Sequence, residues 1–518
     1  MDKYNPTIGL EIHAELKTKT KMFCDSLNDP DEKHPNINVC PVCLSHPGTL
    51  PTINKQAVEH VIKVGLALGG KINPVAKFDR KNYFYPDLPK GYQISQYDQP
   101  LVVGGELLGV RIRRVHLEED TGTLVHRSNI ERIKPNGKRI FDNNSISFDE
   151  NSRESASLVD FNRAGVPLIE IVTEPDLKSA KEVVVFAKEL QLILRYLGVS
   201  DADMEKGQMR IEANVSLRPN NKRLVNPKFG KDSVEFDENS SENLGTKVEL
   251  KNINSFRFAK EAIEYEIKRQ SEVLDSGAEV THETRGWDDI KQKTVSQRSK
   301  EEAHDYRYFP EPDLPSIDTS IFDLEKIKIE LPEMPKQKRE RLAKEYGLNE
   351  KQTETLVGEP KLAQYFEEAV SELKEKNPEA KITGVFNYLT SDLTGLMNEA
   401  GVGFEDLKID PEHLAHLALL IETGKIGSRQ AKDVLRKMFE TGLDPEDIVK
   451  SEGLETVSDA SELEKVVKEV LEKNPKAVED YKKGKTASLQ FLVGQAMGRL
   501  KGRGNPEALG KIFEEALK

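Results

Sequence analysis

One short stretch near the start of the chain decides the fold class: Gly9-Leu10-Glu11-Ile12-His13-Ala14-Glu15-Leu16. Its apolar and polar residues alternate, and this period of two is typical of a β-strand, in which neighbouring side chains point to opposite faces. Glu11, His13 and Glu15 would then share one face. Such a polar face is either exposed to solvent, as is ordinary in α+β proteins, or a set of ligands.

A second strand is predicted where Glu170 interrupts an otherwise apolar run, Pro167-Leu168-Ile169-Glu170-Ile171-Val172. Burying a carboxylate without a partner is costly, because the charge loses its hydration. Glu170 therefore needs either a bound cation or a structural ion pair with an arginine such as Arg163.

The pattern along the whole chain predicts an α+β fold. Short apolar runs and turn residues alternate with a few helices through the first half of the chain. One helix is expected over residues 179–198, because Ser179 and Glu182 form a capping box and apolar residues recur along one face. Another is expected over 258–274. After about residue 331 helical periods dominate, so the C-terminal part should be all-α.

We expect three domains, because the chain has 518 residues and a domain has roughly 100–200. Residues 1–295 should form a mixed domain with an antiparallel sheet. A helical linker domain follows over 296–408, and an all-α tail domain over 409–518. The polar segment 127–156, rich in Asn and Ser, is expected to be an exposed insertion without chemistry.

Composition bounds the location and the partners. The chain starts without a signal peptide, and no apolar stretch approaches the roughly 18 residues that a membrane span needs. We therefore expect a cytoplasmic protein without disulfides. A formal net charge of -13 excludes binding of nucleic acid by bulk attraction, so an RNA site must be a local patch. Residues 481–518 are the most basic candidate.

Acidic and basic groups elsewhere extend the candidate site. His116-Leu117-Glu118-Glu119-Asp120 is one such run, and a third predicted strand carries Arg210 and Glu212. Carboxylates suit Mg²⁺, whereas a histidine ligand leaves Mn²⁺ open. Cations suit phosphoryl oxygens, and the expected nucleotide-binding residues are Lys81, Arg210, Lys247 and Lys251. The aromatic segment 78–93 around Lys81 either forms core and turn or binds RNA or nucleotide.

Three common catalytic motifs are missing from the sequence. Gly484-Lys485-Thr486 ends like a Walker A loop, but Glu479 stands where its first glycine should be. The sequence also has no nucleophile elbow and no Gly/Ser-rich amidase stretch. Nucleotide must therefore bind in another way, and any nucleophile that releases ammonia must belong to another protein.

The three cysteines, Cys24, Cys40 and Cys43, all fall within the first tenth of the chain. Their clustering indicates one local feature, which is either a set of reduced thiols or a zinc site. A tetrahedral zinc site needs a fourth ligand. The candidates are His34, His46, Asp25 and water.

Seven runs of sequence resemble, in order and spacing, the B subunit of the glutamyl/aspartyl-tRNA amidotransferase. They are residues 8–13, 78–93, 116–122, 158–176, 204–219, 245–256 and 305–313. The run Phe491-Leu492-Val493-Gly494-Gln495-Ala496-Met497 is similar to the YqeY-like helical tail of the same family. The resemblance therefore covers essentially the whole chain.

The resemblance implies an N-terminal cradle domain that binds ATP and metal and phosphorylates the side-chain carboxylate of Glu-tRNA(Gln) or Asp-tRNA(Asn). It also implies two partner proteins: a glutaminase, the A subunit, whose ammonia displaces the phosphate, and often a small C subunit. Carried over position by position, the catalytic and metal residues are Glu11, His13, Glu119, Glu170 and Glu212.

The chain departs from the family pattern at two places. Glu212 stands where many relatives have Asp, so the carboxylate arm is one methylene longer. Many relatives also have a C-x-C before the later C-x-x-C, which gives four zinc ligands. Here Cys24 is followed by Asp25 and Ser26, so only three cysteines remain for zinc.

Two alternatives compete with this interpretation. The related archaeal-type E subunit resembles the B subunit in the cradle but carries a large inserted domain, whereas this chain has only the short segment 127–156. The other alternative is a noncatalytic tRNA-binding scaffold that keeps the tail and has lost the kinase site. The intact acidic set argues against the scaffold.

Overall fold

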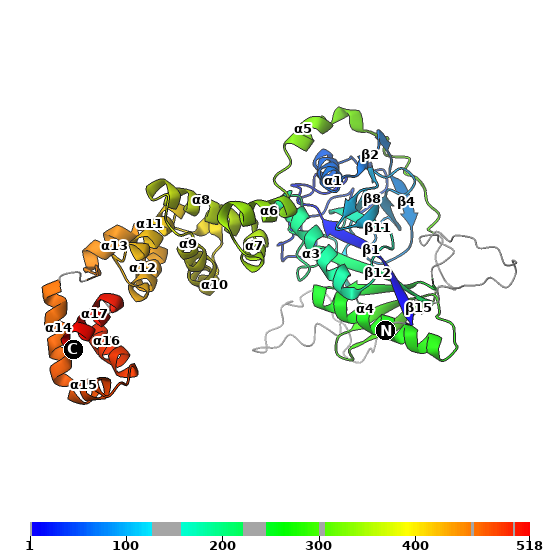
Figure 1. Cartoon of the computed structure of the whole chain (residues 1–518). Coiled ribbons are helices and arrows are strands. Elements are labelled where there is room, and N and C mark those ends of the chain that lie inside the picture. The colour runs from blue at the N-terminus through cyan, green and yellow to red at the C-terminus, as the bar shows by residue number, and fades with distance from the viewer. Residues whose placement is uncertain are drawn as a thin grey trace, which may run out of the picture. The chain divides into compact units, whose positions relative to one another are not determined.

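The computed structural model describes residues 3–126, 157–220, 245–299, 306–456, 460–500 and 503–517. The predicted insertion at 127–156 lies outside the described residues. The chain divides into two compact units, Met1–Pro335 and Lys336–Lys518. Among the described residues, strands occur only in the first unit, and the second contains helices (Figure 1). The predicted α+β class is confirmed.

Ten strands of the described residues form one sheet in the N-terminal unit. Its order is β15-β14-β13-β12-β1-β11-β8-β6-β2, with β7 paired to β8. In that order the strands span Lys293–Ser299, Glu283–Asp288, Val248–Ile253, Met209–Pro219, Tyr4–Glu15, Pro167–Thr173, Val110–Glu119, Val102–Val103 and Lys71–Ile72, with β7 at Glu106–Leu107. The stretch that decided the fold class thus lies in β1, inside the sheet.

The strand pairs of this sheet are antiparallel, as predicted, with one exception. Strands β13 and β14 run parallel. Parallel neighbours need a long crossover connection, and α4 (Phe256–Asp275) supplies it. Strand periodicity is the same in both arrangements, so it does not predict this exception.

Helices α1 (Lys55–Ala67), α3 (Ala180–Tyr196) and α4 contribute apolar residues to the core on one face of the sheet (Figure 1). The side chains that β1 adds to this core are at most 1% exposed: Ile8, Leu10, Ile12 and Ala14. Glu11, His13 and Glu15 alternate with them and are only partly buried. The predicted alternation of β1 is therefore confirmed.

Helix α3 confirms the predicted helix at 179–198, including its cap. The Ser179 hydroxyl accepts a hydrogen bond from the Glu182 backbone N–H at 3.2 Å, and the Glu182 carboxylate accepts one from the Lys178 N–H at 2.8 Å. The apolar face expected from the sequence is buried, with Phe186 at its centre. The predicted helix at 258–274 corresponds to α4.

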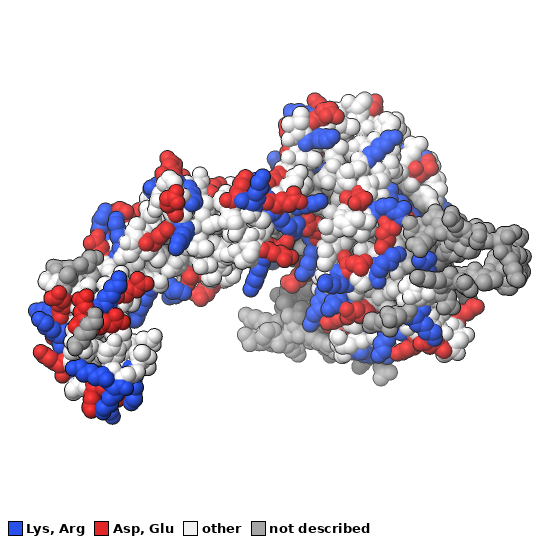
Figure 2. All heavy atoms as spheres, viewed as in Figure 1, with Lys and Arg blue, Asp and Glu red and all other residues white. Residues whose placement is uncertain are grey.

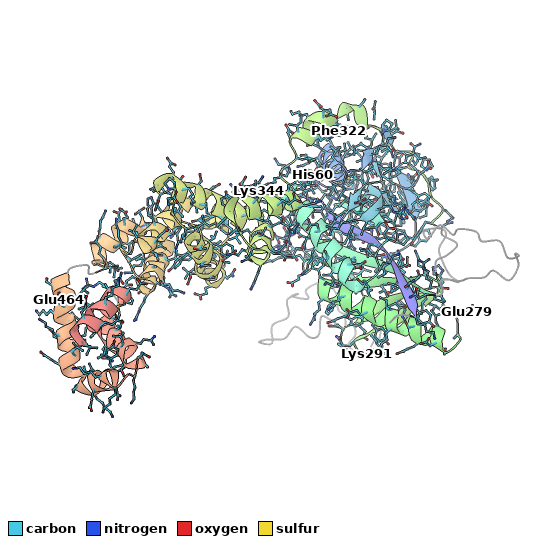
Figure 3. The ribbon with its side chains drawn as sticks, in the orientation of Figure 1. His60, Glu279, Lys291, Phe322, Lys344 and Glu464 are labelled. Carbon is cyan, nitrogen blue, oxygen red and sulfur yellow. The ribbon has the colours of Figure 1, made fainter. Side chains whose placement is uncertain are left out.

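Among the described residues, three smaller sheets, one 3₁₀-helix and one further α-helix also belong to the N-terminal unit. Phe322 and Ile327 belong to the main core. Figure 3 shows Phe322 and, on α1, His60. The core thus includes residues beyond 295, while the division into 1–295, 296–408 and 409–518 stays a prediction. The remaining elements are β9 (Thr123–His126) with β10 (Ser157–Asp160), β16 (Phe309–Pro310) with β4 (Asp79–Asn82) and β5 (Tyr92–Ser95), β17 (Ile317–Asp318) with β3 (Val75–Ala76), η3 (Thr319–Ile321) and α5 (Leu324–Ile329).

The second unit is helical throughout its described residues, as predicted. In its last part Leu463, Val467 and Phe513 form a separate core. The helices from the start of the unit are α6 (Pro335–Tyr346), α7 (Glu350–Val357), α8 (Pro360–Lys376), α9 (Thr383–Asn387), η4 (Tyr388–Leu393), α10 (Thr394–Ala400), η5 (Phe404–Asp406), α11 (Pro411–Glu422), α12 (Ser428–Thr441), α13 (Pro445–Glu452), α14 (Ala460–Lys473), α15 (Pro475–Lys482), α16 (Ala487–Arg499) and α17 (Pro506–Leu517).

Acidic and basic side chains are mixed on the face of each unit that Figure 2 shows. This mixture fits the formal net charge of -13 and the expectation that an RNA contact is a local patch. In the part of the chain that the structure describes, no helix combines the length and the apolar composition that a membrane crossing requires.

The packing of α3 can be tested by two substitutions side by side. Phe186 is 1% exposed, whereas Val185 is 49% exposed. Phe186→Ala leaves a cavity, so we expect the free energy of unfolding of the N-terminal unit to fall by about 3–5 kcal/mol. Val185→Ala, on the solvent side, should change it by less than about 0.5 kcal/mol. Urea denaturation of the full chain measures both, and equal losses would contradict this packing.

Candidate active site

The register of three adjacent strand pairs gathers the predicted site on the polar face of the sheet. Strand β1 pairs with β11, with His13 opposite Glu170, and with β12, with Glu11 opposite Glu212. Strand β11 also aligns Glu170 with His116 of β8. Because directly opposite residues of antiparallel strands share a face, the register alone brings these side chains together.

His13, Glu118 and Glu170 form the first carboxylate cluster, in which one donor atom of each lies within 4.8 Å of the others. His13 Nε2 is 3.6 Å from Glu170 Oε2 and 4.0 Å from Glu118 Oε2. His116 Nε2 is 3.0 Å from Glu170 Oε2 and 3.4 Å from Glu118 Oε1. Both carboxylates are buried. Two histidines therefore flank two buried acids.

These contacts set the protonation states of the cluster. Burial would raise the pKa of Glu170, but His116 and His13 hold it well below its usual value. Burial also opposes a charge on His116, yet Glu170 and Glu118 raise its pKa to about 9. Burial opposes a charge on His13 too, but Glu170, together with Glu212 and Glu118, raises its pKa. Opposite charges thus stabilise one another where water is largely excluded.

Glu118 is held by polar groups of β5 and faces the predicted residue Lys81 of β4. Ser95 Oγ donates to Glu118 Oε1 at 2.6 Å, and Gln93 Nε2 donates to Oε2 at 2.9 Å. Lys81 Nζ lies 3.9 Å from Glu118 Oε1 and 5.3 Å from the centre of the Tyr306 ring. Burial opposes the charge of Lys81, but Glu118 keeps its pKa well above the usual value. Lys81 thus supplies a fixed positive charge.

Glu11, Glu212 and Glu249 form the second carboxylate cluster, again with one oxygen of each within 4.8 Å of the others. Lys251 Nζ is 2.8 Å from a Glu212 oxygen and 3.7 Å from a Glu249 oxygen. Burial would lower the pKa of Lys251, but Glu212 and Glu249 raise it above its usual value. Asn214 Nδ2 donates to Glu11 Oε1 at 2.9 Å. The five predicted site residues therefore do not form one group.

Glu119 belongs to neither cluster. It follows Glu118 on β8, so its side chain projects to the opposite face of the strand. There Lys90 Nζ donates to Glu119 Oε2 at 2.6 Å, and the Ile94 backbone N–H donates to Oε1 at 2.9 Å. The structure thus places Glu118, and not Glu119, beside His13.

Arg210 and Arg163 both contact Asp120. Arg210 Nη2 donates to Asp120 Oδ2 at 2.6 Å, and Arg163 Nε is 3.6 Å from the same oxygen. The ion pair between Arg163 and Glu170 that the sequence left open is therefore not formed, and Glu170 contacts histidines instead. Lys247 is exposed just before β13 and belongs to neither cluster.

The three cysteines form a third group, as their clustering predicted. One Sγ of each lies within 4.8 Å of the others, and the thiols are free. A hydrogen bond from Cys24 lowers the pKa of Cys43 to about 4, although burial opposes this. The same hydrogen bond raises the pKa of Cys24, and burial adds to the effect. Zinc binding by these residues stays a prediction.

The sequence places His116 and Glu118 in a candidate acidic run but assigns only Glu119 of that run to the metal, and it assigns no role to Glu249, although a signal for each was present. Residues two apart on a strand share a face, so His116 predicts a role for Glu118 rather than for its neighbour. The same rule pairs Glu249 with Lys251 in Val248-Glu249-Leu250-Lys251. What the sequence does not show is that these strands lie next to β11 and β12.

Both units match known families. The family described as the GatB/GatE catalytic domain matches residues 6–322. The family described as the GatB domain, of the Yqey type, matches residues 364–517. These matches cover most of each unit.

Three curated relatives, each named as the B subunit of an aspartyl/glutamyl-tRNA(Asn/Gln) amidotransferase, match over essentially their full lengths. The protein of Persephonella marina is 44% identical over 100% of both chains. That of Dehalococcoides mccartyi is 45% identical over 100% of this chain and 99% of its own, and that of Thermotoga maritima is 44% identical over 99% of each.

Fold and matches together define a tRNA-dependent amidotransferase, a ligase that forms carbon–nitrogen bonds. Within this class the chain belongs to the B-subunit family, as its sequence predicted. This result favours the B subunit over the E subunit and over a noncatalytic scaffold.

The contacts of His116 predict how stability depends on pH when metal has been removed with a chelator. The folded pKa of about 9 lies above the unfolded value of 6.5. The stabilisation by protonated His116 is therefore complete below about pH 6.5 and is lost as the pH rises through about 9. Urea denaturation across this range measures it. In Glu170→Gln one of the two acids that raise the pKa of His116 is gone, so the total loss should be smaller and should be complete at a lower pH. Identical profiles would contradict the His116–Glu170 contact.

Proposed function

We propose that this chain phosphorylates the side-chain carboxylate of Glu-tRNA(Gln), Asp-tRNA(Asn) or both with ATP, and that ammonia then displaces the phosphate. The proposal rests on two carboxylate clusters that lie on one sheet. A lysine is close to each of them, Lys81 to the first cluster and Lys251 to the second. The names of the relatives supply the two tRNA substrates.

The donor chemistry of both clusters fits Mg²⁺, which prefers carboxylate oxygens. The imidazole of His13 also admits Mn²⁺ in the first cluster. A bound Mg²⁺ would neutralise charge on phosphoryl oxygens. The proposed ligand sets are His13, Glu118 and Glu170 for one ion, and Glu11, Glu212 and Glu249 for the other.

Glu118 replaces the predicted Glu119 in this proposal. The reason is the hydrogen bond of 2.6 Å that ties Glu119 to Lys90 on the other face of β8. Glu119 is therefore paired with Lys90. His116, the histidine nearest to Glu118, also contacts Glu170.

Lys81 and Lys251 are the residues that we propose to contact phosphate. Nearby carboxylates raise the pKa of both above the usual value, so both stay charged at neutral pH. Phosphoryl transfer spreads negative charge over several oxygens, and fixed cations stabilise that charge best. The nucleotide-binding roles of Arg210 and Lys247 stay predictions from the sequence.

The chemistry explains why ATP is needed. A carboxylate is a poor electrophile, because its negative charge repels a nucleophile. Transfer of the γ-phosphoryl group to a carboxylate oxygen gives an acyl phosphate and ADP. Ammonia then attacks the carbonyl carbon, the C–O bond to phosphate breaks, and the nitrogen loses a proton to give the amide. A site that excludes water protects the acyl phosphate from hydrolysis.

The partners follow from what the chain lacks. Its sequence has no nucleophile elbow or amidase stretch, so we propose that ammonia comes from a glutaminase A subunit, joined by a small C subunit. Charged tRNA(Gln) or tRNA(Asn) is the third partner, and we propose that the assembly is cytoplasmic.

The two adjacent glutamates of β8 test the proposed metal site. Glu118→Gln removes a ligand charge, so phosphorylation of the tRNA-bound carboxylate should slow about a hundredfold or more. Glu119→Gln is the matched control and should retain the Mg²⁺ dependence of the wild type. Rates measured against Mg²⁺ concentration separate the two, and a shift in Mg²⁺ dependence for Glu119→Gln alone would refute the assignment.

A second test concerns the source of ammonia. The purified chain should not hydrolyse glutamine, because its sequence contains neither a nucleophile elbow nor an amidase stretch. With ATP and Mg²⁺, ammonium chloride should still support slow amidation of mischarged tRNA. Adding the glutaminase should restore the use of glutamine and serves as the control. Release of ammonia from glutamine by the pure chain would show that the proposed division of labour is incorrect.

A further inference from the structure

Five tyrosines of the described residues form a row of rings beside the first carboxylate cluster. In order along this tyrosine row they are Tyr97, Tyr308, Tyr306, Tyr83 and Tyr85. The rings of Tyr97 and Tyr308 are stacked, with their centres 4.3 Å apart and an angle of 11° between their planes. The other neighbours meet edge to face, with 6.0, 6.0 and 6.5 Å between ring centres. Both arrangements are favourable for aromatic pairs, so ring contacts hold the row together.

The small sheet of β16, β4 and β5 positions the tyrosine row. Tyr83 directly follows β4, and Tyr308 directly precedes β16, which pairs with β4. Asn82 is the last residue of β4. Its backbone N–H donates to the Tyr306 carbonyl oxygen and its side-chain amide to the Arg307 carbonyl oxygen, both at 2.9 Å. Tyrosines that are distant in sequence therefore meet because these two strands pair.

The backbone between Tyr306 and Tyr308 has an unfavourable conformation. Arg307 has a φ of 43°, in the left-handed region that residues other than glycine rarely adopt. Such conformations persist only where the surroundings impose them, and they are concentrated at functional sites. Here the hydrogen bonds from Asn82 impose the conformation, so the two rings are placed at a cost in stability.

The tyrosine row extends from the proposed active site to the surface. Lys81 Nζ lies 5.3 Å from the centre of the Tyr306 ring and 3.9 Å from Glu118 Oε1. Tyr306 is 39% exposed, and the two ends of the row, Tyr97 and Tyr85, are 54% and 61% exposed. Apolar groups that are exposed together mark an interaction surface. The row therefore offers a binding partner aromatic rings next to the first cluster.

The proposed function decides which partner must come close to this cluster. The amino acid joins the carboxylate that is phosphorylated to the terminal ribose of the tRNA through only a few bonds. The last nucleotides of the tRNA are unpaired, and they must therefore lie near Lys81. Unpaired bases stack on aromatic side chains in many proteins that bind single strands. Several rings in a row suit consecutive bases, whereas ATP has a single base.

We infer that the tyrosine row binds the unpaired 3′ end of the charged tRNA by stacking, with the terminal base on Tyr306 and a preceding base on the exposed face of Tyr97. In this role the tyrosines are positioning residues, because they hold the nucleotides while the clusters and Lys81 act on the carboxylate. The inference rests on the proposed function, since that function brings the 3′ end to the clusters.

A tRNA(Gln) whose terminal adenine is replaced by 2-aminopurine tests the contact with Tyr306 in the full chain. The fluorescence of 2-aminopurine falls when the base stacks, so it should fall when the wild-type chain binds this tRNA. Tyr306→Phe should keep the fall, because the ring remains, and Tyr306→Leu should lose it. No fall with the wild type, or the same fall with Tyr306→Leu, would overturn the inference.

The outer end of the tyrosine row is tested by the affinity for the same tRNA. Tyr97→Leu should raise the dissociation constant about tenfold, as the loss of one base stack does, and Tyr97→Phe should restore the wild-type value. Phe84→Leu is the matched control, because Phe84 is 79% exposed and belongs to no ring pair among the described residues. It should leave the affinity unchanged. Equal losses in Tyr97→Leu and Phe84→Leu would contradict a contact specific to the row.

Kinetics with ATP separate this inference from the proposed function. The KM for ATP should be the same in Tyr306→Leu as in the wild type. A raised KM for ATP with an unchanged fluorescence response would assign the row to the base of ATP, and the inference would fail. Phosphorylation of the tRNA-bound carboxylate by the wild-type chain is measured separately. Its absence, with the fluorescence response intact, would refute the proposed function and leave the stacking contact in place.

Discussion

The candidate active site depends on the pairing of β1 with β11 on one edge and β12 on the other. This one strand aligns Glu170 with His13 and Glu212 with Glu11. A slip of one residue would turn every polar side chain of β1 into the core and every apolar one out of it. The apolar face of β1, at most 1% exposed, therefore fixes the position of the polar face. Stability and the geometry of the site rest on the same hydrogen bonds.

The packing that fixes the site also buries Glu118, Glu170 and His116, so these charged groups lose hydration. Carboxylates of both clusters face cations of the protein: histidines at the buried Glu170, and Lys251 at the partly buried Glu212. The histidines hold the pKa of Glu170 well below its usual value, and the nearby carboxylates raise the pKa of His116 and of Lys251. A divalent ion that enters the first cluster must compete with the protons on His13 and His116. Metal binding and proton release are therefore linked in this arrangement.

The sequence was sufficient for features that depend on local periodicity. The alternation in β1, the capped helix α3 and the change to an all-α region all follow from spacing and capping, and all are present. Features that depend on contacts distant in sequence were harder. The partner of Glu170 is two histidines rather than Arg163, because strand order, which no local pattern encodes, brings β1 and β8 to either side of β11. Likewise the parallel pairing of β14 depends on where α4 returns the chain.

Strand β8 ends in two glutamates that serve different surroundings. Glu118 faces the histidines, whereas Glu119 lines a cavity beside Cys24 and Cys43 and is held by Lys90. Their Cα atoms are joined by one rigid peptide unit, about 3.8 Å apart. A displacement of β8 that changes the distance from Glu118 to His116 therefore also changes the distance from Glu119 to Lys90. The two glutamates therefore lie on opposite faces of the strand and move together with its backbone.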